Sequence, residues 1–402
     1  MTSSNPTGTG RFSLNRKANT YIGTYSHAVG YQTTASGYGS CAEGEETTAS
    51  GEGAHAEGYK TTASGGGAHA EGGGTIAAGG NSHAEGSGTI VTNDSSIVPT
   101  YYPPNLNAYG ADGHAEGFKT ISYGPGGHAE GCRTFAKGAF SHAEGCDAQA
   151  IGNYSHAAGF DTIANQYQYV VGCYNKNTTA PTSLSDTTTS AGLFIVGIGS
   201  STSARANGFR INPAGNAYGV GAFGTSGADY AEYFEWADGN PNNEDRRGRF
   251  VTLDGDKIRY ATTEDDYVLG IISAEPTVVG DIQSEMWHNM YLKDIYGNKL
   301  VEVVEVEESI DENDKIIPAH TERRWVLNPD YDPEMKYISR EERPEWDAVG
   351  IVGKLVAVDD GTCQVNGYCY PNIDGVATVS KEKTAYRVIE RLDDTHIRIF
   401  IK

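Results

Sequence analysis

Short blocks of alternating small and polar residues recur through the first 165 residues of this chain. The first block reads His-Ala-Glu-Gly and stands at 55–58, 69–72, 83–86, 114–117, 128–131 and 142–145. The second block reads Thr-x-Ala-x-Gly, as at 47–51 and 61–65. Because side chains alternate across a strand, each block predicts a short strand closed by glycine. Alanine, serine and threonine would point into a narrow interior, and histidine, glutamate and the x residues would point outward.

The histidines define the length of the repeat. They stand at 27, 55, 69, 83, 114, 128, 142 and 156, and Cys41 takes the place expected between the first two. The spacing is 14 residues except for one step of 31, which gives nine repeats and one 17-residue insertion. A period of 14 is too short for helical or propeller repeats. It fits one coil of a β-solenoid made of two short strands and two turns.

The insertion spans about residues 91–108 and contains Pro and Asn residues that forbid a continued strand. It is therefore expected to protrude as a loop. Tyr101, Tyr102 and Tyr109 would offer an aromatic surface to a glycan or protein ligand. The alternative is a loop that folds back on the solenoid.

Stacked coils would set the histidines in a column beside a column of glutamates, with equivalent positions about 4.8 Å apart. The histidines would offer the glutamates hydrogen bonds and, when protonated, opposite charge. A functional site rarely needs eight copies, so the columns are interpreted as a structural ladder and no metal site is predicted. Two alternatives stay open. Histidine rings from three chains could hold ions around an axis, or one privileged His/Glu pair could serve a glycan-cleaving enzyme.

A second outward row follows the first threonine of each second block. It consists of Thr34, Thr48, Thr62, Ile76, Ile90, Ile121, Phe135, Gln149 and Ile163. A solenoid this thin cannot bury an apolar row by itself, so chains are expected to associate along their length. The 14-residue, two-strand coil resembles the left-handed β-roll heads of trimeric autotransporter adhesins over about residues 20–165. The resemblance implies a parallel homotrimer and leaves open whether the His/Glu columns face the three-fold axis or the solvent.

The sequence changes character after the last repeat. Residues 166–224 contain isolated β segments such as GLFIVGIG that are too short to fold alone, which predicts an intertwined neck of the trimer. From residue 225, period-2 segments such as RFVTL and IRIFI predict a compact β-rich domain. Its segment DYAEYFEW places Asp229, Glu232 and Glu235 three residues apart. That spacing predicts one face of a helical turn, on which clustered carboxylates raise one another's pKa values and divide acid and base roles.

The DYAEYFEW segment, with VLGIISAEPTVVGD after it and GFRINPAGNAYG before it, resembles the C-terminal intramolecular chaperone domain of phage tail spikes and appendages. The resemblance covers about residues 205–402. That family is classed as a glutamic peptidase and cuts itself off the finished trimer. The resemblance implies Asp229 and Glu232 as the acidic pair, Glu235 as a supporting acid, and one cut between Ala228 and Asp229.

The exact bond has alternatives. Ala228 stands where the family's known example has serine, and Ser226 lies two residues earlier. In a second chemistry, the Ser226 hydroxyl attacks the preceding carbonyl and the chain is cut after Thr225. In a third interpretation, DYAEYFEW only anchors the domain and no cut occurs.

Charge and cysteine content narrow the partners. Residues 1–228 carry 15 acidic and 10 basic side chains, and residues 229–402 carry 37 and 20. This acidity argues against nucleic acid or an anionic membrane as a partner. The N-terminus has no apolar signal segment, and no run approaches the roughly 18 apolar residues of a membrane helix. The six cysteines lack zinc-like spacing and are expected to be reduced, although Cys132 and Cys146 should come within disulfide range.

The whole sequence predicts a mainly β homotrimer in four parts. These are an N-terminal attachment segment (1–24), a left-handed parallel β-roll shaft (25–165), an intertwined β neck (166–224) and an intramolecular chaperone and autoproteolytic domain (225–402). The predicted function is a phage or prophage tail fibre or spike that binds the host surface. It would be made in the host cytoplasm, reside in the virion tail and cleave itself once, without a cofactor. Expected partners are a tail or baseplate protein at the N-terminus and a host glycan or protein. A bacterial adhesin-like protein and a glycan-degrading tail enzyme are the alternatives.

Overall fold

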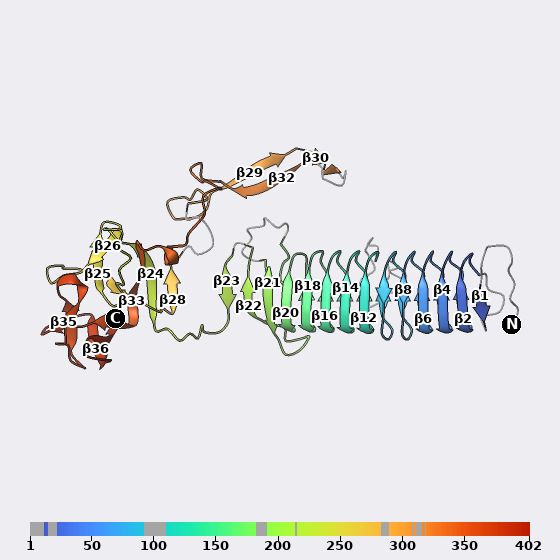
Figure 1. Cartoon of the computed structure of the whole chain (residues 1–402), viewed down its shortest axis with the longest axis horizontal. Helices are drawn as coiled ribbons and strands as arrows, with labels where there is room; N and C mark the ends of the chain where they lie inside the picture. The colour runs from blue at the N-terminus through green and yellow to red at the C-terminus, as the bar shows by residue number, and fades with distance from the viewer. Residues whose placement is uncertain are drawn as a thin grey trace. The chain divides into compact units, whose positions relative to one another are not determined.

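The fold is built almost entirely from β-strands (Figure 1). The computed structural model describes residues 12–14, 22–91, 110–181, 191–213, 215–282, 289–307, 309–310, 316–317 and 319–402. The chain divides into two compact units, residues 1–222 and 223–402, which are described separately. Among the described residues, no helix combines the length and the hydropathy that a membrane span requires.

The first unit is a β-solenoid with 14-residue coils, as the repeat predicts. The first strand of each coil pairs in parallel with the same strand of the next coil. Within the repeats these strands are β2 (His27–Tyr31), β4 (Cys41–Glu45), β6 (His55–Tyr59), β8 (His69–Ala70), β10 (His83–Ala84), β12 (His114–Phe118), β14 (His128–Cys132), β16 (His142–Cys146) and β18 (His156–Phe160).

The second strands form a separate parallel sheet. They are β3 (Thr34–Ala35), β5 (Thr48–Ala49), β7 (Thr62–Ala63), β9 (Ile76–Ala77), β11 (Ile90–Val91), β13 (Ile121–Ser122), β15 (Phe135–Ala136), β17 (Gln149–Ala150) and β19 (Ile163–Ala164). The register is unbroken across the insertion, because His83 pairs with His114 and Ile90 with Ile121. The insertion itself, with Tyr101, Tyr102 and Tyr109, lies outside the described residues.

The interior of the solenoid is filled by small side chains. The alanines that point inward have no exposed surface, and neither do most of the threonines that begin the second blocks. They include Ala28, Ala42, Ala56, Ala70, Ala84, Ala115, Ala129, Ala143, Ala157, Thr33, Thr47, Thr61, Thr75, Thr120 and Thr162. The predicted narrow interior is therefore confirmed.

One glycine column explains why the first block always ends in glycine. Gly30, Gly44, Gly58, Gly72, Gly86, Gly117, Gly131, Gly145, Gly159 and Gly172 have φ between 98° and 124°. A Cβ on Gly131 would lie 2.2 Å from the carbonyl oxygen of Gly145 in the next coil. Stacked backbones leave no room for a side chain at this position, and only glycine adopts the φ value readily.

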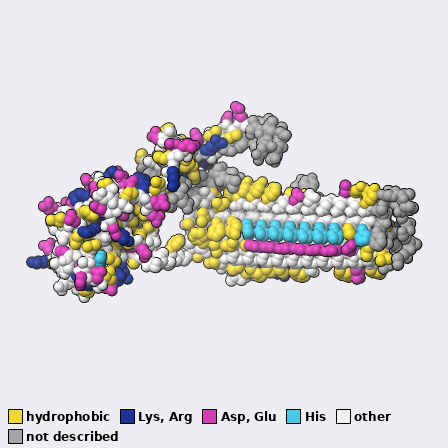
Figure 2. Space-filling model, viewed as in Figure 1, with side chains coloured by type: hydrophobic (Ala, Val, Ile, Leu, Met, Phe, Trp, Pro, Cys, Tyr) yellow, Lys and Arg dark blue, Asp and Glu magenta, His cyan; other side chains and the backbone are white. Residues whose placement is uncertain are grey.

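The outward rows agree with the sequence except at two coils. Figure 2 shows the histidines as a stripe beside a stripe of acidic side chains. The expectation that the second outward row is uncovered in a single chain is wrong for Ile121 and Phe135, which are 6% and 2% exposed. These two side chains pack in one cluster with the buried ring of Tyr123, two residues after Ile121. Alternation along a strand correctly predicts that both side chains point outward, but it takes no account of the ring of Tyr123 that covers them.

The same sheet continues beyond the repeats. β1 (Phe12–Leu14) adds a parallel strand at one end, and β20 (Tyr169–Cys173) and β21 (Phe194–Ile198) add two at the other. β22 (Asn207–Ile211) and β23 (Ala217–Gly219) follow in antiparallel order. Within this chain the described strands of 166–224 thus extend the solenoid sheet. Intertwining with other chains stays a prediction.

The second unit contains a mostly antiparallel sheet. Its strands run in the order β26 (Lys257–Tyr260), β25 (Phe250–Asp254), β27 (Gly270–Ile272), β33 (Trp346–Val358), β37 (His396–Ile401), β36 (Tyr386–Arg391), β34 (Tyr368–Pro371) and β35 (Ala377–Ser380). β24 (Asp229–Glu235) pairs with β33 and with β28 (Val278–Gly280). Two short 3-10 helices, η1 (Arg340–Glu342) and η2 (Ile373–Gly375), and two hairpins, β29 (Val301–Val306) with β32 (His320–Trp325) and β30 (Ser309–Ile310) with β31 (Ile316–Ile317), complete the described elements.

Two apolar clusters hold the second unit together. One contains Phe250, Ile397 and Ile399. The other contains Trp236, whose indole donates a 2.8 Å hydrogen bond to Asp347 and lies against the guanidinium of Arg246. The last residue of the DYAEYFEW segment therefore anchors the end of β24 in the core.

Candidate active site

The strand that carries the predicted acids begins at the predicted cut. β24 starts at Asp229 and runs between β33 and β28. The amide of Lys354 donates a 3.1 Å hydrogen bond to the carbonyl oxygen of Ala228, and the amide of Thr277 donates one of 2.7 Å to the carbonyl oxygen of Asp229. The carbonyl of the peptide bond between Ala228 and Asp229 therefore already accepts a hydrogen bond, and so does the carbonyl of the next peptide bond.

Gly353 allows β33 to approach this peptide bond closely. Its φ is +116°, a conformation that L side chains rarely adopt. A Cβ at this position would lie 2.3 Å from the carbonyl oxygen of Ala228 and 2.8 Å from the Cα of Asp229. The hydrogen bond from Lys354, the next residue, depends on this contact between backbones.

The carboxyl group of Asp229 lies in an enclosed position. The residue is 6% exposed, and its Oδ2 has no hydrogen-bond partner among the described residues. A Cβ on Gly350 would come within 2.8 Å of that oxygen. Burial raises the pKa of Asp229, and a hydrogen bond with the Ser273 side chain offsets part of the rise. The group nearest the predicted cut is thus an acid whose surroundings favour the protonated form.

Comparison with protein families shows to which family the chain belongs. The model of the Peptidase_G2, IMC autoproteolytic cleavage domain matches residues 182–393, more than half of the chain. The chain belongs to this family. The match includes β24 and the two strands that pair with it, β28 and β33.

Related proteins match only part of this chain. The pre-neck appendage protein of Bacillus phage B103 is 35% identical over 151 residues, which is 38% of this chain and 16% of that protein. The pre-neck appendage protein of Bacillus phage phi29 is 32% identical over 155 residues, 39% of this chain and 16% of that protein. The putative phage-related protein YobO of Bacillus subtilis (strain 168) is 34% identical over 170 residues, 42% of this chain and 19% of that protein. The matches thus span less than a fifth of the length of these relatives.

Two solved structures of bacteriophage phi29 gene product 12 are also similar. Its C-terminal fragment is 28% identical, with a TM-score of 0.34 over 43% of this chain and 100% of the fragment. The pre-mature protein is 17% identical, with a TM-score of 0.45 over 98% of this chain and 40% of that protein.

The helical turn predicted for the acidic segment of the Peptidase_G2 domain is wrong. Residues 229–235 form the extended strand β24, whose backbone pairs with strands on both sides. Alternation along a strand places Asp229 and Glu232 on opposite faces. The phenol of Tyr230 donates a 2.6 Å hydrogen bond to Glu232, and Lys257 bonds Glu235 at 2.6 Å. The carboxylates do not gather within one chain, and burial is the main cause of the raised pKa of Asp229.

A pocket of about 570 Å³ adjoins the predicted cut. Ser226, Ala228 and Asp229 line it together with side chains from distant strands, which include Arg247, Lys354, His396 and Arg398. These basic residues were not found from the sequence, because no motif connects them to DYAEYFEW. The same holds for Ser273 and for the Lys354 amide, which is a backbone group that any residue type would supply.

The alternative junction has a different environment. Thr225 and Ser226 are both exposed. The hydroxyl of Thr225 donates a 3.2 Å hydrogen bond to the hydroxyl of Thr277 and a longer one to the carbonyl oxygen of Gly227. The described contacts therefore hold the 228–229 peptide more firmly than the 225–226 peptide.

The His/Glu columns are a series of near-identical pairs. From His55 to His142, neighbouring rings stack with centroids 4.6 to 4.9 Å apart. Hydrogen bonds between neighbouring glutamates raise the pKa of Glu85 and Glu130 to about 7 and lower the pKa of Glu71 and Glu116. The titration of each carboxyl group in the column is thus linked to that of its neighbours. Among the described coils no pair has the separate environment that a glycan-cleaving site requires.

Proposed function

We propose that this chain is part of a phage appendage or tail-fibre protein whose Peptidase_G2 domain cuts its own backbone once, between Ala228 and Asp229. The family membership supports self-cleavage. The names of the related pre-neck appendage proteins support a place in a virion. One observation supports the choice of this bond: the carbonyl of Ala228 accepts a backbone hydrogen bond, and the next residue, Asp229, is a buried acid.

The geometry supports a hydrolysis in which the chain supplies the polarising groups. Water from the adjoining pocket adds to the carbonyl carbon of Ala228. The charge that develops on the carbonyl oxygen is stabilised by the Lys354 amide, which already points at it. Burial favours a protonated Asp229 carboxyl group, which gives its proton to the departing amide nitrogen. The C–N bond then breaks, leaving a carboxylate on Ala228 and an amino group on Asp229.

The base that accepts the proton of the water is assigned to Glu232 of a neighbouring copy. Within one chain, Glu232 lies on the opposite face of β24 from Asp229. A parallel homotrimer would bring equivalent β24 strands from different copies near one another. This arrangement makes cleavage depend on assembly, which is the behaviour expected of a chaperone that leaves only a finished trimer.

Intact-mass measurement of the folded full chain tests the proposed cut. Fragments that end at Ala228 and begin at Asp229 are the expected result. Fragments that separate Thr225 from Ser226 would support the serine chemistry instead, and a Ser226→Ala variant would then stop the cut. A single full-length species from the assembled wild-type chain would contradict self-cleavage altogether.

A mixing experiment tests the role of Glu232. Asp229→Asn and Glu232→Gln chains, distinguished by a small tag on one of them, are expected to remain intact when folded alone. When the two are folded together, the Glu232→Gln chain should be cut, because it keeps Asp229 and receives the glutamate from its neighbour. No cut in the mixed assemblies, with wild-type chains cut under the same conditions, would show that Glu232 does not act between chains.

The remaining parts of the proposed function concern the solenoid, the N-terminal segment and the assembly of copies. The solenoid would form the shaft, residues 1–24 would attach to a tail or baseplate protein, and the host-surface ligand would be a glycan or protein. The partly exposed row that includes Ile76, Ile90 and Ile163 supports lengthwise association of copies. Size-exclusion chromatography with light scattering is expected to give three times the chain mass, and a monomer would contradict the trimer.

A further inference from the structure

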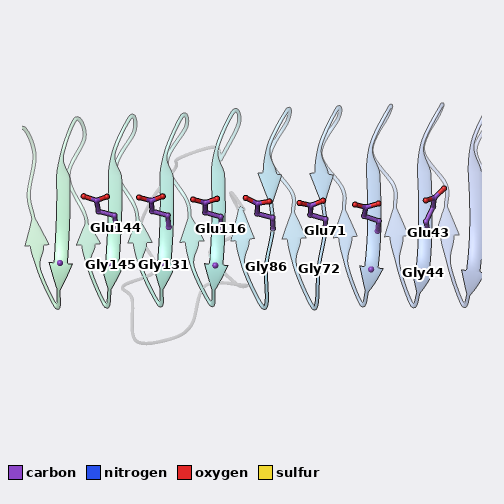
Figure 3. Close-up of a pocket in the computed structure, with 15 residues that line it drawn as sticks. Glu43, Gly44, Glu71, Gly72, Gly86, Glu116, Gly131, Glu144 and Gly145 are labelled. Atoms are coloured by element: carbon purple, nitrogen blue, oxygen red, sulfur yellow. The ribbon is translucent and has the colours of Figure 1, made fainter.

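The glutamate column of the solenoid lines a long open groove. Figure 3 shows carboxyl groups from successive coils pointing the same way above the glycine column. The groove has a volume of about 970 Å³ and is lined by Glu43, Glu57, Glu71, Glu85, Glu116, Glu130, Glu144 and the glycines that follow the glutamates. The histidine column runs alongside it (Figure 2). This groove lies in the solenoid and is separate from the cleavage site.

The histidines present nitrogen atoms to the glutamates without bonding them. The Nε2 atoms of His55, His69, His83, His114, His128 and His142 have almost no exposed surface and no hydrogen-bond partner among the described residues. Their nearest carboxylate oxygens are too far for a hydrogen bond, for example 3.9 Å from His83 to Glu71 and 3.6 Å from His142 to Glu130. The pairs at the two ends of the column are closer, with 3.2 Å between His156 and Glu144 and 3.3 Å between His27 and Glu43.

These separations suit two ligands on one metal ion. Bonds of roughly 2.0–2.2 Å around a tetrahedral zinc ion set two ligand atoms about 3.3–3.5 Å apart. In the group Glu71, His83 and Glu85, one ligand atom from each residue lies within 4.8 Å of the others. The group Glu57, His69 and Glu71 has the same arrangement one coil earlier. Side-chain shifts of less than about 1 Å would therefore bring an imidazole and two carboxylates onto one ion.

We infer that the neighbouring histidine and glutamate columns bind divalent transition-metal ions such as Zn²⁺ or Co²⁺ at the edge of this groove. Imidazole nitrogen with carboxylate oxygen is a ligand set that suits these ions, whereas Mg²⁺ and Ca²⁺ take oxygen ligands. The glutamate carboxyl groups line the open groove, so an ion can reach them from solvent. The same small side-chain shifts would bring a buried histidine Nε2 atom onto that ion. The ions would replace repulsion within the glutamate column by attraction between coils.

Charge balance sets how many ions the groove takes. The ring stacking places equivalent atoms of neighbouring coils about 4.8–4.9 Å apart. Doubly charged ions in every coil would repel strongly at that distance and would have one carboxylate each. An ion in every second coil is neutralised by two glutamates. The seven glutamates of the groove then hold about three ions per chain.

Metal uptake by the untagged full chain tests the inference. After treatment with a chelator and dialysis, titration with ZnCl₂ followed by elemental analysis should give about three ions per chain, and MgCl₂ should give none. CoCl₂ should produce the visible absorption of a low-coordinate Co²⁺ site. Absence of Zn²⁺ uptake, or a Co²⁺ spectrum no different from that of the hydrated ion, would overturn the inference.

Paired variants assign the uptake to the groove. Glu71→Gln with Glu85→Gln keeps the side-chain size and should lower zinc uptake by at least one ion per chain. The exposed turn residue Glu52, outside the column, provides the control variant Glu52→Gln, which should keep full uptake. Uptake that is equal in both variants would place the metal elsewhere and reject the groove. If the double variant fails to fold by circular dichroism, Glu116→Gln with Glu130→Gln supplies the same comparison.

Discussion

The contact between Gly353 and the proposed cut gives the most direct test of how the active site works. Replacing Gly353 with alanine adds a Cβ that would stand 2.3 Å from the carbonyl oxygen of Ala228, whereas real Cβ contacts stay above 3.0 Å. β33 must therefore withdraw from this peptide by the better part of an ångström. The hydrogen bond from the Lys354 amide, now 3.1 Å, would lengthen or break.

The expected loss follows from the two consequences of that withdrawal. Removing one donor from the developing oxyanion costs about 10²–10³ in rate, and a displacement near 1 Å of reacting groups costs about 10². Because both describe the same movement, they are not added. Gly353→Ala should therefore slow cleavage by at least about 10²-fold and leave the oligomeric state of the chain unchanged.

The assay follows full-length chain and fragments by intact mass during folding from the denatured state. Gly255→Ala is the matched control, because Gly255 also has a positive φ, +68°, but a Cβ there would meet nothing within 4 Å. It should cleave at close to the wild-type rate. If Gly353→Ala cleaves within a few-fold of Gly255→Ala, the held carbonyl is not part of the mechanism. If neither the control nor the wild type cleaves, the proposed function itself is wrong.

Two further predictions concern stability. Gly131→Ala should destabilise the fold by about 1–3 kcal/mol through overpacking, in addition to roughly 1–2 kcal/mol for a side chain at positive φ. Gly53→Ala has open space around its Cβ and should lose only the stability that the positive φ costs. Equal thermal melting curves for the two variants would refute the steric role of the glycine column. Asp229→Asn should raise the urea midpoint at neutral pH when compared in a Glu232→Gln background that keeps both chains intact. Burial raises the folded-state pKa of Asp229, so its contribution to stability is full below the unfolded pKa of about 3.9 and is lost as the pH rises through the folded pKa. A midpoint difference that does not shrink toward pH 3 would contradict this explanation.

The solenoid could be predicted because every coil repeats the same steric demand. The identical spacing of alanine and glycine reports a narrow interior and close backbones, and Cys41 is recognised as a member of the histidine column from its position alone. The burial of Ile121 and Phe135 could not be predicted, because it depends on Tyr123, a residue that breaks the repeat. The repeat therefore predicts the features that all coils share, and not those of a coil whose residues differ from the repeat.

The candidate site is only partly predictable from the sequence. Asp229 stays a prediction, whereas the helical turn predicted from the spacing of three is wrong, because residues 229–235 pair with strands β28 and β33 as an extended chain. Those partners lie some tens to more than a hundred residues downstream. The Lys354 amide gives no signal in the sequence, since a backbone donor is the same for every residue type except proline.

The register of the strands is unbroken between residues 91 and 110, so the length of the solenoid does not depend on the segments inserted between its coils. Its length is set by the number of 14-residue coils, each adding one strand spacing, while extra segments can be accommodated at a corner without displacing the next coil. Length and surface decoration can therefore vary independently. A solenoid of this kind can gain or exchange an inserted segment between two coils, and the coils beyond it keep the same positions along the stack.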